Sequence, residues 1–216
     1  PHMLIGGSTG SGKSVLLKLV LMQCVKKDAK VYIADFKGGV DFPPIWHTKC
    51  SLLTDEKTLH KVLVSITDEL QSRKQILRTA GVANIDGYNR NAKKKLYRIV
   101  FACDEIAEVL DKTGLSKQQK DEILKIESEL SIIARQGRAF GIHLVLATQR
   151  PDAAILNGQI RNNIDTRICG RADNVLSQII LDNTDASDKI AKSSQGRFLT
   201  NSGKIFQAYW FDENIL

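Results

Sequence analysis

Short apolar runs alternate along this chain with longer segments in which apolar residues recur at every third or fourth position. The short runs predict strands and the longer segments predict helices, and the alternation is typical of an α/β fold with a mainly parallel central sheet flanked by helices. The first five predicted strands are rich in Val, Ile and Leu, as expected of strands buried on both faces. The predicted strands cover residues 3–5, 31–34, 98–103, 143–147, 166–169, 197–199 and 205–210, and the turn residues 201–203 make the last two a C-terminal hairpin.

Three long helices are predicted between these strands. Residues 14–25 are apolar almost all round, which predicts a buried helix. A second helix is expected over 55–80, with Thr54 as its N-cap and Gly81 in the position where a glycine often follows a helix. A third is expected over 120–139, with its apolar residues on the inner side.

The apolar stripe of helix 55–80 contains one charged residue. Steps of three and four residues from Ile66 and Leu70 reach Arg73, so this arginine lies in the phase of the stripe. A charge in the phase of an apolar stripe is an anomaly.

Composition sets broad limits on the class of protein. The chain has 216 residues, of which 43% are apolar and 25% charged, and this excludes disorder, a collagen-like chain and a disulfide scaffold. No linker rich in Pro, Gly or Ser divides it, so we expect one domain over residues 1–216. Lys and Arg number 31 against 24 Asp and Glu, a net charge of +7 that allows an anionic partner without identifying one.

Cysteine usage and apolar segments indicate a compartment. The four cysteines, Cys24, Cys50, Cys103 and Cys169, show no metal or redox spacing, and we expect reduced thiols in a cytosolic domain. No apolar run approaches the roughly 18 residues needed to cross a bilayer, so we expect no membrane contact by these residues. Because the chain begins within a predicted strand, we expect a fragment of a longer protein that is anchored elsewhere in the bacterial cell membrane.

A glycine-rich segment carries the strongest chemical signal. The run Gly7-Ser8-Thr9-Gly10-Ser11-Gly12-Lys13-Ser14 fits the pattern G-x-x-x-x-G-K-[ST], follows a predicted strand and opens a predicted helix. In that context the backbone amides surround the phosphates of ATP, Lys13 reaches the outer phosphates, and the Ser14 hydroxyl is a ligand of Mg²⁺. A glycine-rich turn with a chance lysine is the alternative, and the flanking strand and helix argue against it.

Two further strands end in residues suited to nucleotide hydrolysis. Asp104 ends the apolar run 98–103 and is the expected second Mg²⁺ ligand, while Glu105 is the expected residue that activates water. The second carboxylate favours an NTPase with a catalytic glutamate over kinases and GTPase switches. Gln149 follows the predicted strand 143–147. In NTPases with the extra glutamate this strand lies between the phosphate-loop strand and the carboxylate strand, so Gln149 is the expected sensor of the γ-phosphate. Either strand alone could simply end in a polar turn.

Taken together, these segments resemble the motor domain of the FtsK/SpoIIIE family. The run from Gly141 to Pro151, which reads Gly-Ile-His-Leu-Val-Leu-Ala-Thr-Gln-Arg-Pro, is the most specific match. The resemblance implies a RecA-like P-loop NTPase fold, assembly into a hexameric ring around DNA, and DNA translocation driven by ATP hydrolysis at sites shared between subunits. The segments that carry it are 1–14, 103–105, 138–151 and 163–168.

The resemblance also offers a role for Arg73. A segment similar to Glu69-Leu70-Gln71-Ser72-Arg73 carries an arginine finger in related ATPases, so Arg73 is expected to complete the site of a neighbouring subunit. The alternative is an arginine whose stem packs on the helix flank while its charge reaches water. Arg135 and Arg167 are weaker candidates for the same role.

Some segments differ from the chromosome-segregation members of the family. Residues 35–39 read Asp-Phe-Lys-Gly-Gly in place of Asp-Pro-Lys, and 183–187 replace a Gly-Ala-Glu segment. Gly196-Arg197-Phe198 is closer to conjugation proteins of Gram-positive mobile elements and to type VII secretion ATPases. A predicted loop at 88–95 holds four basic residues that could contact DNA phosphates, although such runs are more often solvated surface.

The sequence therefore predicts an ATP-hydrolysing DNA translocase motor, acting in conjugative transfer or DNA segregation. No base-reading element is visible, so binding to DNA should be weakly specific in sequence. Relaxase proteins or secretion proteins are candidates for further partners. The alternatives are a type VII secretion ATPase of the same family that moves proteins, and a scaffold that binds nucleotide without hydrolysing it.

Overall fold

The central sheet of the computed structural model has the predicted α/β architecture. The structure describes residues 1–38, 40–150 and 156–216, and within them eight strands run in the order β3-β2-β4-β5-β1-β6-β7-β8. Strands β3, β2, β4, β5, β1 and β6 run parallel to one another. Strand β7 pairs antiparallel with both β6 and β8. The strands are β1 (Met3–Gly6), β2 (Lys30–Ala34), β3 (Ser51–Leu53), β4 (Ile99–Cys103), β5 (Ile142–Thr148), β6 (Thr166–Cys169), β7 (Arg197–Thr200) and β8 (Ile205–Gln207).

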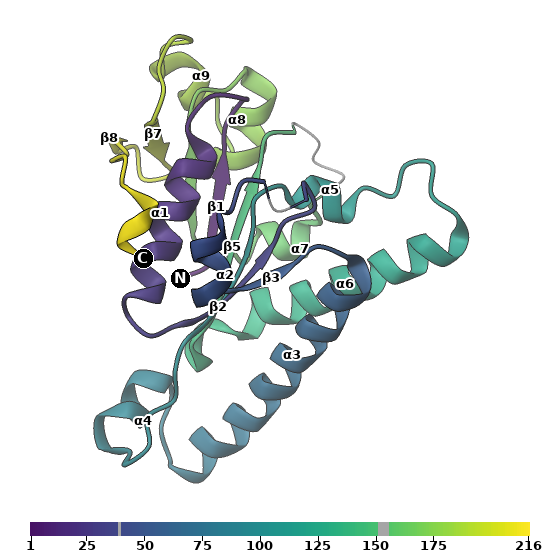
Figure 1. Cartoon of the computed structure of the whole chain (residues 1–216), viewed down its shortest axis with the longest axis vertical. Coiled ribbons are helices and arrows are strands. Elements are labelled where there is room, and N and C mark those ends of the chain that lie inside the picture. Colours follow the sequence, from purple (N-terminus) through teal and green to yellow (C-terminus); the bar gives the residue numbers. More distant parts are fainter. Residues whose placement is uncertain (39, 151–155) are drawn as a thin grey trace.

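Helices cover each face of this sheet (Figure 1). Helix α1 packs on one face, and α3, α6 and α8 pack on the other. The described helices are α1 (Lys13–Val25), α2 (Pro44–Lys49), α3 (Glu56–Thr79), α4 (Ile85–Asn91), α5 (Ile106–Leu110), α6 (Lys117–Gln136), α7 (Gly158–Arg161), α8 (Asn174–Leu181) and α9 (Asp185–Lys189). Two short 3₁₀ helices, Arg138–Phe140 and Glu213–Ile215, complete the set.

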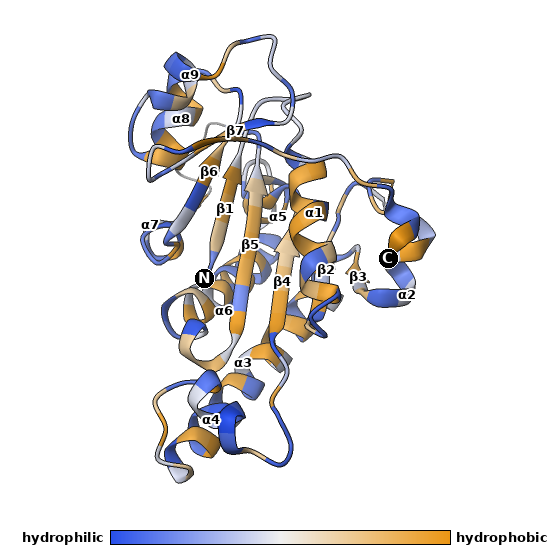
Figure 2. Ribbon diagram, turned by 90° about the vertical axis from the view of Figure 1, so that its left-hand side faces the viewer, coloured by the Kyte–Doolittle hydropathy of each residue, from blue (hydrophilic) through white to orange (hydrophobic). Residues whose placement is uncertain are grey.

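The central strands are buried on both faces, as their composition predicts. Every residue of β4 is buried, and Phe101 packs with α3 and α6 while Val100 packs with α1. Neighbouring residues reach opposite layers because side chains alternate along a strand. Figure 2 shows β4 and β5 as mostly hydrophobic ribbons in the middle of the fold.

For the predicted helix 55–80, the expected N-cap is wrong and the expected glycine after the C-terminus is confirmed. Asp55, and not Thr54, is the N-cap of α3, because its carboxylate accepts a hydrogen bond from the Thr58 amide at 2.9 Å. Gly81 follows the helix with φ +64°, which confirms the predicted glycine position. Thr54 and Asp55 are adjacent and both residue types cap helices, so the sequence pattern alone did not show which of the two is the N-cap.

Three other boundaries also needed correction. Helix α6 starts at Lys117 because Ser116 and Gln119 form a capping box, and a 3₁₀ turn replaces the end of the predicted helix 120–139. The short edge strand β3 was not predicted, since three residues show no readable period. Strand β8 ends at Gln207 instead of residue 210.

The predicted basic loop 88–95 is also partly helical. Asn84 caps α4 through the Gly87 amide, so the first half of the segment lies in this helix. The second half is tied back by Asn89, whose side chain exchanges hydrogen bonds of 2.8 and 2.9 Å with the backbone of Leu96. The lysines therefore lie before β4, at the amino end of the parallel strands.

Candidate functional site

The glycine-rich loop lies at the carboxyl end of β1 and leads directly into α1. A Cβ atom on Gly7 would come within 2.4 Å of the Ser11 hydroxyl, so the loop closes this tightly only with glycine. Gly12 has φ +91°, and a Cβ there would lie 2.9 Å from the backbone nitrogen of Gly196. The loop is therefore compact and held against a distant segment of the chain.

Two segments that the sequence did not connect with this loop hold it in place. The backbone amide of Ser8 donates to the carbonyl of Arg171 at 2.8 Å, and the Arg171 guanidinium donates to the carbonyl of Thr9 at 2.5 Å. The amide of Gly196 donates to the carbonyl of Ser11 at 2.8 Å. Arg171 follows β6, which pairs with β1, and Gly196 precedes β7, which pairs with β6, so only the strand order brings these residues to the loop.

Asp104 is the centre of the polar network next to the loop. Lys13 donates to the Asp104 side chain at 3.2 Å and to its backbone carbonyl at 2.6 Å, and the Ser14 hydroxyl lies 3.1 Å from the same carboxylate. Asp104 is only 2% exposed. Burial alone would raise its pKa, but the ammonium groups of Lys13 and Lys37 outweigh burial and hold the pKa below its usual range.

Lys37 is a further member of this network that the sequence did not predict. It lies in the turn after β2, and its ammonium donates to the Asp104 carboxylate at 3.1 Å. Partial burial lowers the pKa of Lys37, but the charge of Asp104 more than compensates, so the pKa ends above its ordinary value. The only signal in the sequence was that residues 35–37, which read Asp-Phe-Lys, keep the lysine of the family's Asp-Pro-Lys segment.

Glu105 lies beside Asp104 and contacts the end of β5. Its Oε1 accepts a 2.6 Å hydrogen bond from the Thr148 hydroxyl, and its Oε2 accepts a 2.9 Å bond from the Gln149 amide. The side chain of Gln149 in turn accepts a hydrogen bond from the Thr9 hydroxyl at 3.0 Å. Glu105 is 3% exposed, so these partners satisfy a carboxylate that is nearly closed to water.

The predicted strand order is confirmed. Strand β5 pairs with β4 on one side and with β1 on the other, which places Gln149 between the phosphate loop and the two carboxylates. Lys13, Ser14, Asp104, Glu105 and Gln149 therefore converge at one edge of the sheet, as the motif order predicts.

The residues present fit ATP with Mg²⁺. A cavity of about 380 Å³ is lined by Ser8–Val15 together with Lys37 and Gln149. Helix α1 has no side chain capping its first amides, and the buried Ser11 hydroxyl has no hydrogen-bond partner among the described residues. Free amides at a helix N-terminus bind phosphate oxygens.

A divalent ion at this site would need ligands from the nucleotide. The described ranges bring no three His, Cys, Asp or Glu side chains together as a metal cluster, so Ser14 and Asp104 are the protein ligands that the site offers. A site with one or two protein ligands and substrate phosphates is the usual arrangement for Mg²⁺.

The expectation that Arg73 is an exposed arginine finger is wrong for this structure. Its side chain is 0% exposed, forms a 2.8 Å ion pair with Glu69 and donates to the carbonyl of Phe140 at 2.8 Å. The guanidinium also lies 5.1 Å from the ring centre of Tyr97. These partners compensate most of the charge within the chain, while the Nη2 group of Arg73 is buried with no hydrogen-bond partner among the described residues.

The two weaker candidates differ in their surroundings. Arg135 is exposed on α6 and its Nε donates to the Ser131 carbonyl at 3.2 Å. Arg167 is mostly covered and donates to the carbonyls of Ile164 and Arg161 at 3.2 and 3.0 Å. Arg135 is therefore the more accessible of the two.

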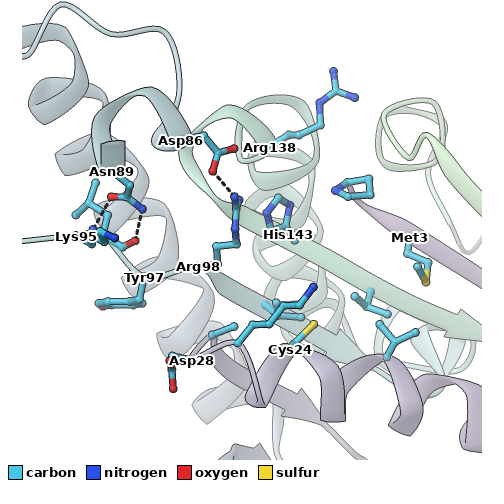
Figure 3. A pocket seen from close by; sticks show the side chains of 17 residues that line it. Met3, Cys24, Asp28, Asp86, Asn89, Lys95, Tyr97, Arg98, Arg138 and His143 are labelled. Carbon is cyan, nitrogen blue, oxygen red and sulfur yellow. Dashed lines mark hydrogen bonds and ion pairs between the residues drawn. The ribbon is translucent and has the colours of Figure 1, made fainter. Parts of the chain in front are cut away.

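A cavity larger than the one at the phosphate loop lies away from this chemistry. It measures about 810 Å³ and is lined near the amino ends of the central strands by residues such as Met3, Cys24 and His143 (Figure 3). Arg98 forms a 2.6 Å ion pair with Asp86 across part of its rim. This cavity contains none of the phosphate-loop or carboxylate residues, so the smaller cavity at the phosphate loop is the better candidate site.

Comparison with known proteins identifies relatives that match most of the chain. The FtsK/SpoIIIE family model matches residues 1–130, more than half of the chain. The DNA translocase FtsK of Chlamydia pneumoniae is 32% identical over 200 residues, which are 87% of this chain and 25% of that protein. The chain thus spans about a quarter of the length of this relative.

Solved structures give the same picture. The pCW3 conjugation coupling protein TcpA, in a monomer form with ATPγS, is 41% identical with a TM-score of 0.93, covering 100% of this chain and 62% of that one. EssC ATPases 2 and 3 from Geobacillus thermodenitrificans are 23% identical with a TM-score of 0.76, covering 95% of this chain and 38% of theirs. At that identity the second likeness concerns the fold alone.

Proposed function

The chain belongs to the FtsK/SpoIIIE family, and on that premise we propose that it is an ATP-hydrolysing motor domain that moves DNA. The observation that carries the proposal is the convergence of Lys13, Asp104, Glu105 and Gln149 at one edge of the sheet. DNA as the cargo is supported by relatives named DNA translocases, and conjugation by the likeness to a conjugation coupling protein.

The roles of the individual residues follow from their positions. The amides of Gly7–Ser14 and the ammonium of Lys13 bind the phosphates, and Ser14 and Asp104 hold Mg²⁺. When bound, Mg²⁺ neutralises charge on the phosphates. Gln149 lies between the phosphate loop and Glu105 and senses whether the γ-phosphate is present.

Glu105 acts as the base that accepts a proton from the attacking water. Each of its oxygens accepts one hydrogen bond, from the Thr148 hydroxyl or the Gln149 amide, and keeps a second lone pair that can accept the proton. Gln149 contacts the phosphate loop through Thr9 and Glu105 through its amide. A change at the loop when nucleotide binds can therefore be transmitted to Glu105 through Gln149 alone.

We propose that the motor works as a hexameric ring, which the family resemblance implies. Arg73 is buried within its own subunit, so another cation must reach the neighbouring site. Arg135 is exposed on α6 and is the remaining accessible candidate of the three arginines.

The proposed DNA contact is weakly specific in sequence. Lys93, Lys94 and Lys95 are exposed before β4, at the end of the sheet opposite the phosphate loop. Such lysines contact phosphates irrespective of base sequence, and each contact adds to the salt dependence of binding. Within the described residues no helix is long and apolar enough to span a bilayer. Anchoring of the parent protein in the bacterial membrane, and relaxase or secretion partners, stay predictions.

Two rival functions lead to different results. A secretion ATPase of the same family would be stimulated by an exported protein, and it is the nearer rival because it keeps the fold and changes only the cargo. A nucleotide-binding scaffold would bind ATP and leave it intact. The presence of Glu105 beside Asp104 argues against the scaffold, because a scaffold needs no base for water.

The proposal is tested by measuring ATP turnover over a range of protein concentrations, with and without double- and single-stranded DNA. We expect turnover per chain to rise with protein concentration, because neighbouring subunits complete each site, and to rise further with DNA. Turnover that rises with concentration yet ignores DNA would favour a protein cargo. ATP binding without any turnover at every concentration would favour the scaffold.

A further inference from the structure

Lys37 has a fixed place beside the candidate nucleotide site. The Asp35 carboxylate accepts the backbone amide of Lys37 at 2.9 Å, which turns the chain sharply after β2. Strand β2 pairs with β4 so that Ala34 lies opposite Cys103. The residues that follow each strand are therefore neighbours, and Lys37 is brought to Asp104 by backbone pairing.

The ammonium of Lys37 has few alternatives to Asp104. It lies 3.1 Å from one Asp104 oxygen and 3.6 Å from Asp41, whose side chain is 37% exposed. An exposed ion pair of this length adds little energy. Asp104 is thus the principal partner of Lys37 in the described structure.

Asp104 cannot keep all its present partners when the site is filled. Lys13, Ser14 and Lys37 all lie within hydrogen-bond distance of its two oxygens. A divalent ion held by Ser14 and Asp104 would occupy these oxygens and repel an ammonium nearby. Lys37 would then be released into a cavity that it already lines together with the phosphate loop.

The side from which Lys37 approaches selects the phosphate that it meets. The strand order β2-β4-β5-β1 places Lys37 across Asp104 and Gln149 from the start of α1. The uncapped amides at the start of α1 would bind the inner phosphates of the nucleotide. An ammonium on the opposite side of the cavity faces the outer end of the nucleotide.

We propose that Lys37 binds the terminal phosphate of ATP and so makes the site prefer ATP over ADP. This inference rests on the proposed ATP-binding function and adds a second phosphate-binding lysine to Lys13. Lys37 thereby exchanges one anionic partner, Asp104, for another when nucleotide enters.

The test compares the affinities of the 216-residue chain for ATPγS and ADP, each with Mg²⁺, by titration calorimetry. We expect Lys37→Met to weaken ATPγS binding about 10- to 100-fold, the usual effect of losing a hydrogen bond between charged groups, while ADP affinity stays within about twofold. Lys37→Arg should retain part of the preference. Lys57→Met, an exposed lysine of α3, is the matched control and should leave both affinities unchanged.

Equal weakening of the two nucleotides by Lys37→Met, or no weakening, would overturn the inference and leave the proposed function intact. Failure of the wild-type chain to bind either nucleotide would overturn the proposed function, and the inference with it. Thermal unfolding of each variant checks that altered affinity is not a loss of fold.

Discussion

The hydroxyl of Thr148 donates a 2.6 Å hydrogen bond to Oε1 of Glu105 and joins the end of β5 to the carboxylate that follows β4. The two residues are 43 positions apart in the chain and only 5% and 3% exposed. The amide of Gln149 holds the other oxygen of Glu105. The proposed base is therefore positioned by the same strand end that carries the proposed phosphate sensor.

Replacing Thr148 should misplace the base without removing the nucleotide site. We expect Thr148→Val to lower ATP turnover about tenfold or more while ATPγS affinity is unchanged, because the buried Glu105 oxygen loses its partner. The same loss should lower the free energy of unfolding by about 1–3 kcal/mol.

Thr148→Ser keeps the hydroxyl and is the matched control. Phosphate release and ATPγS titration measure the two effects separately. If Thr148→Val turns over ATP as fast as the wild type, the hydrogen bond does not position the base.

Arg73 should contribute to stability within its own subunit. We expect Arg73→Ala to lower the free energy of unfolding by about 2–4 kcal/mol, because the change leaves the Phe140 carbonyl and the Glu69 carboxylate without their donor. Urea denaturation measures the loss. Arg78→Ala, an exposed arginine on the same helix, should stay within about 0.5 kcal/mol of the wild type.

A mixing experiment separates this role from that of a finger. An arginine finger acts across subunits, so Arg73→Ala chains mixed with Lys13→Ala chains would restore turnover if Arg73 served a neighbour. We expect no specific restoration. Restored turnover with a normal free energy of unfolding would reinstate the finger.

Two histidines should make the fold sensitive to mild acid. Burial is the main cause that lowers the pKa of His2 to about 4 and of His143 to about 3, from an ordinary 6.5. Between pH 6.5 and these values the unfolded chain binds more protons than the folded one. The stability due to neutral histidines is therefore complete above pH 6.5 and is lost as the pH falls toward 4.

The size of this loss can be measured by urea denaturation at pH 7.5 and pH 5. We expect about 2 kcal/mol per histidine at pH 5. His143→Gln cannot titrate and should show a smaller loss between the two pH values than the wild type. An equal loss in the variant would show that His143 does not carry the effect.

The features that sequence could predict are local ones. The phosphate loop requires glycine, lysine and serine at fixed spacing between one strand and one helix, so its pattern is readable from residues 7–14. The five central strands are readable because burial on both faces requires continuous apolar runs. Thr148 and Lys37 could not be assigned in this way, since their partners are reached only through the order of the strands.

Arg73 shows a different limit. Its position in the apolar stripe was correctly read, but a buried arginine with a partner one turn away and an arginine that reaches a neighbour leave the same pattern in the sequence. The partners that distinguish them, Phe140 and Tyr97, come from other parts of the chain. The assignment of residues 1–216 to a single domain stays a prediction, and Pro151 of the most specific motif lies outside the described residues.

Phosphate release by wild-type and Glu105→Gln chains, at protein concentrations that permit assembly and with saturating DNA, tests the central claim most directly. We predict that DNA raises wild-type turnover, and that Glu105→Gln retains ATPγS binding while its turnover falls about 100-fold or more. Wild-type turnover that is indifferent to DNA, or a Glu105→Gln chain that hydrolyses ATP at the wild-type rate, would contradict the account.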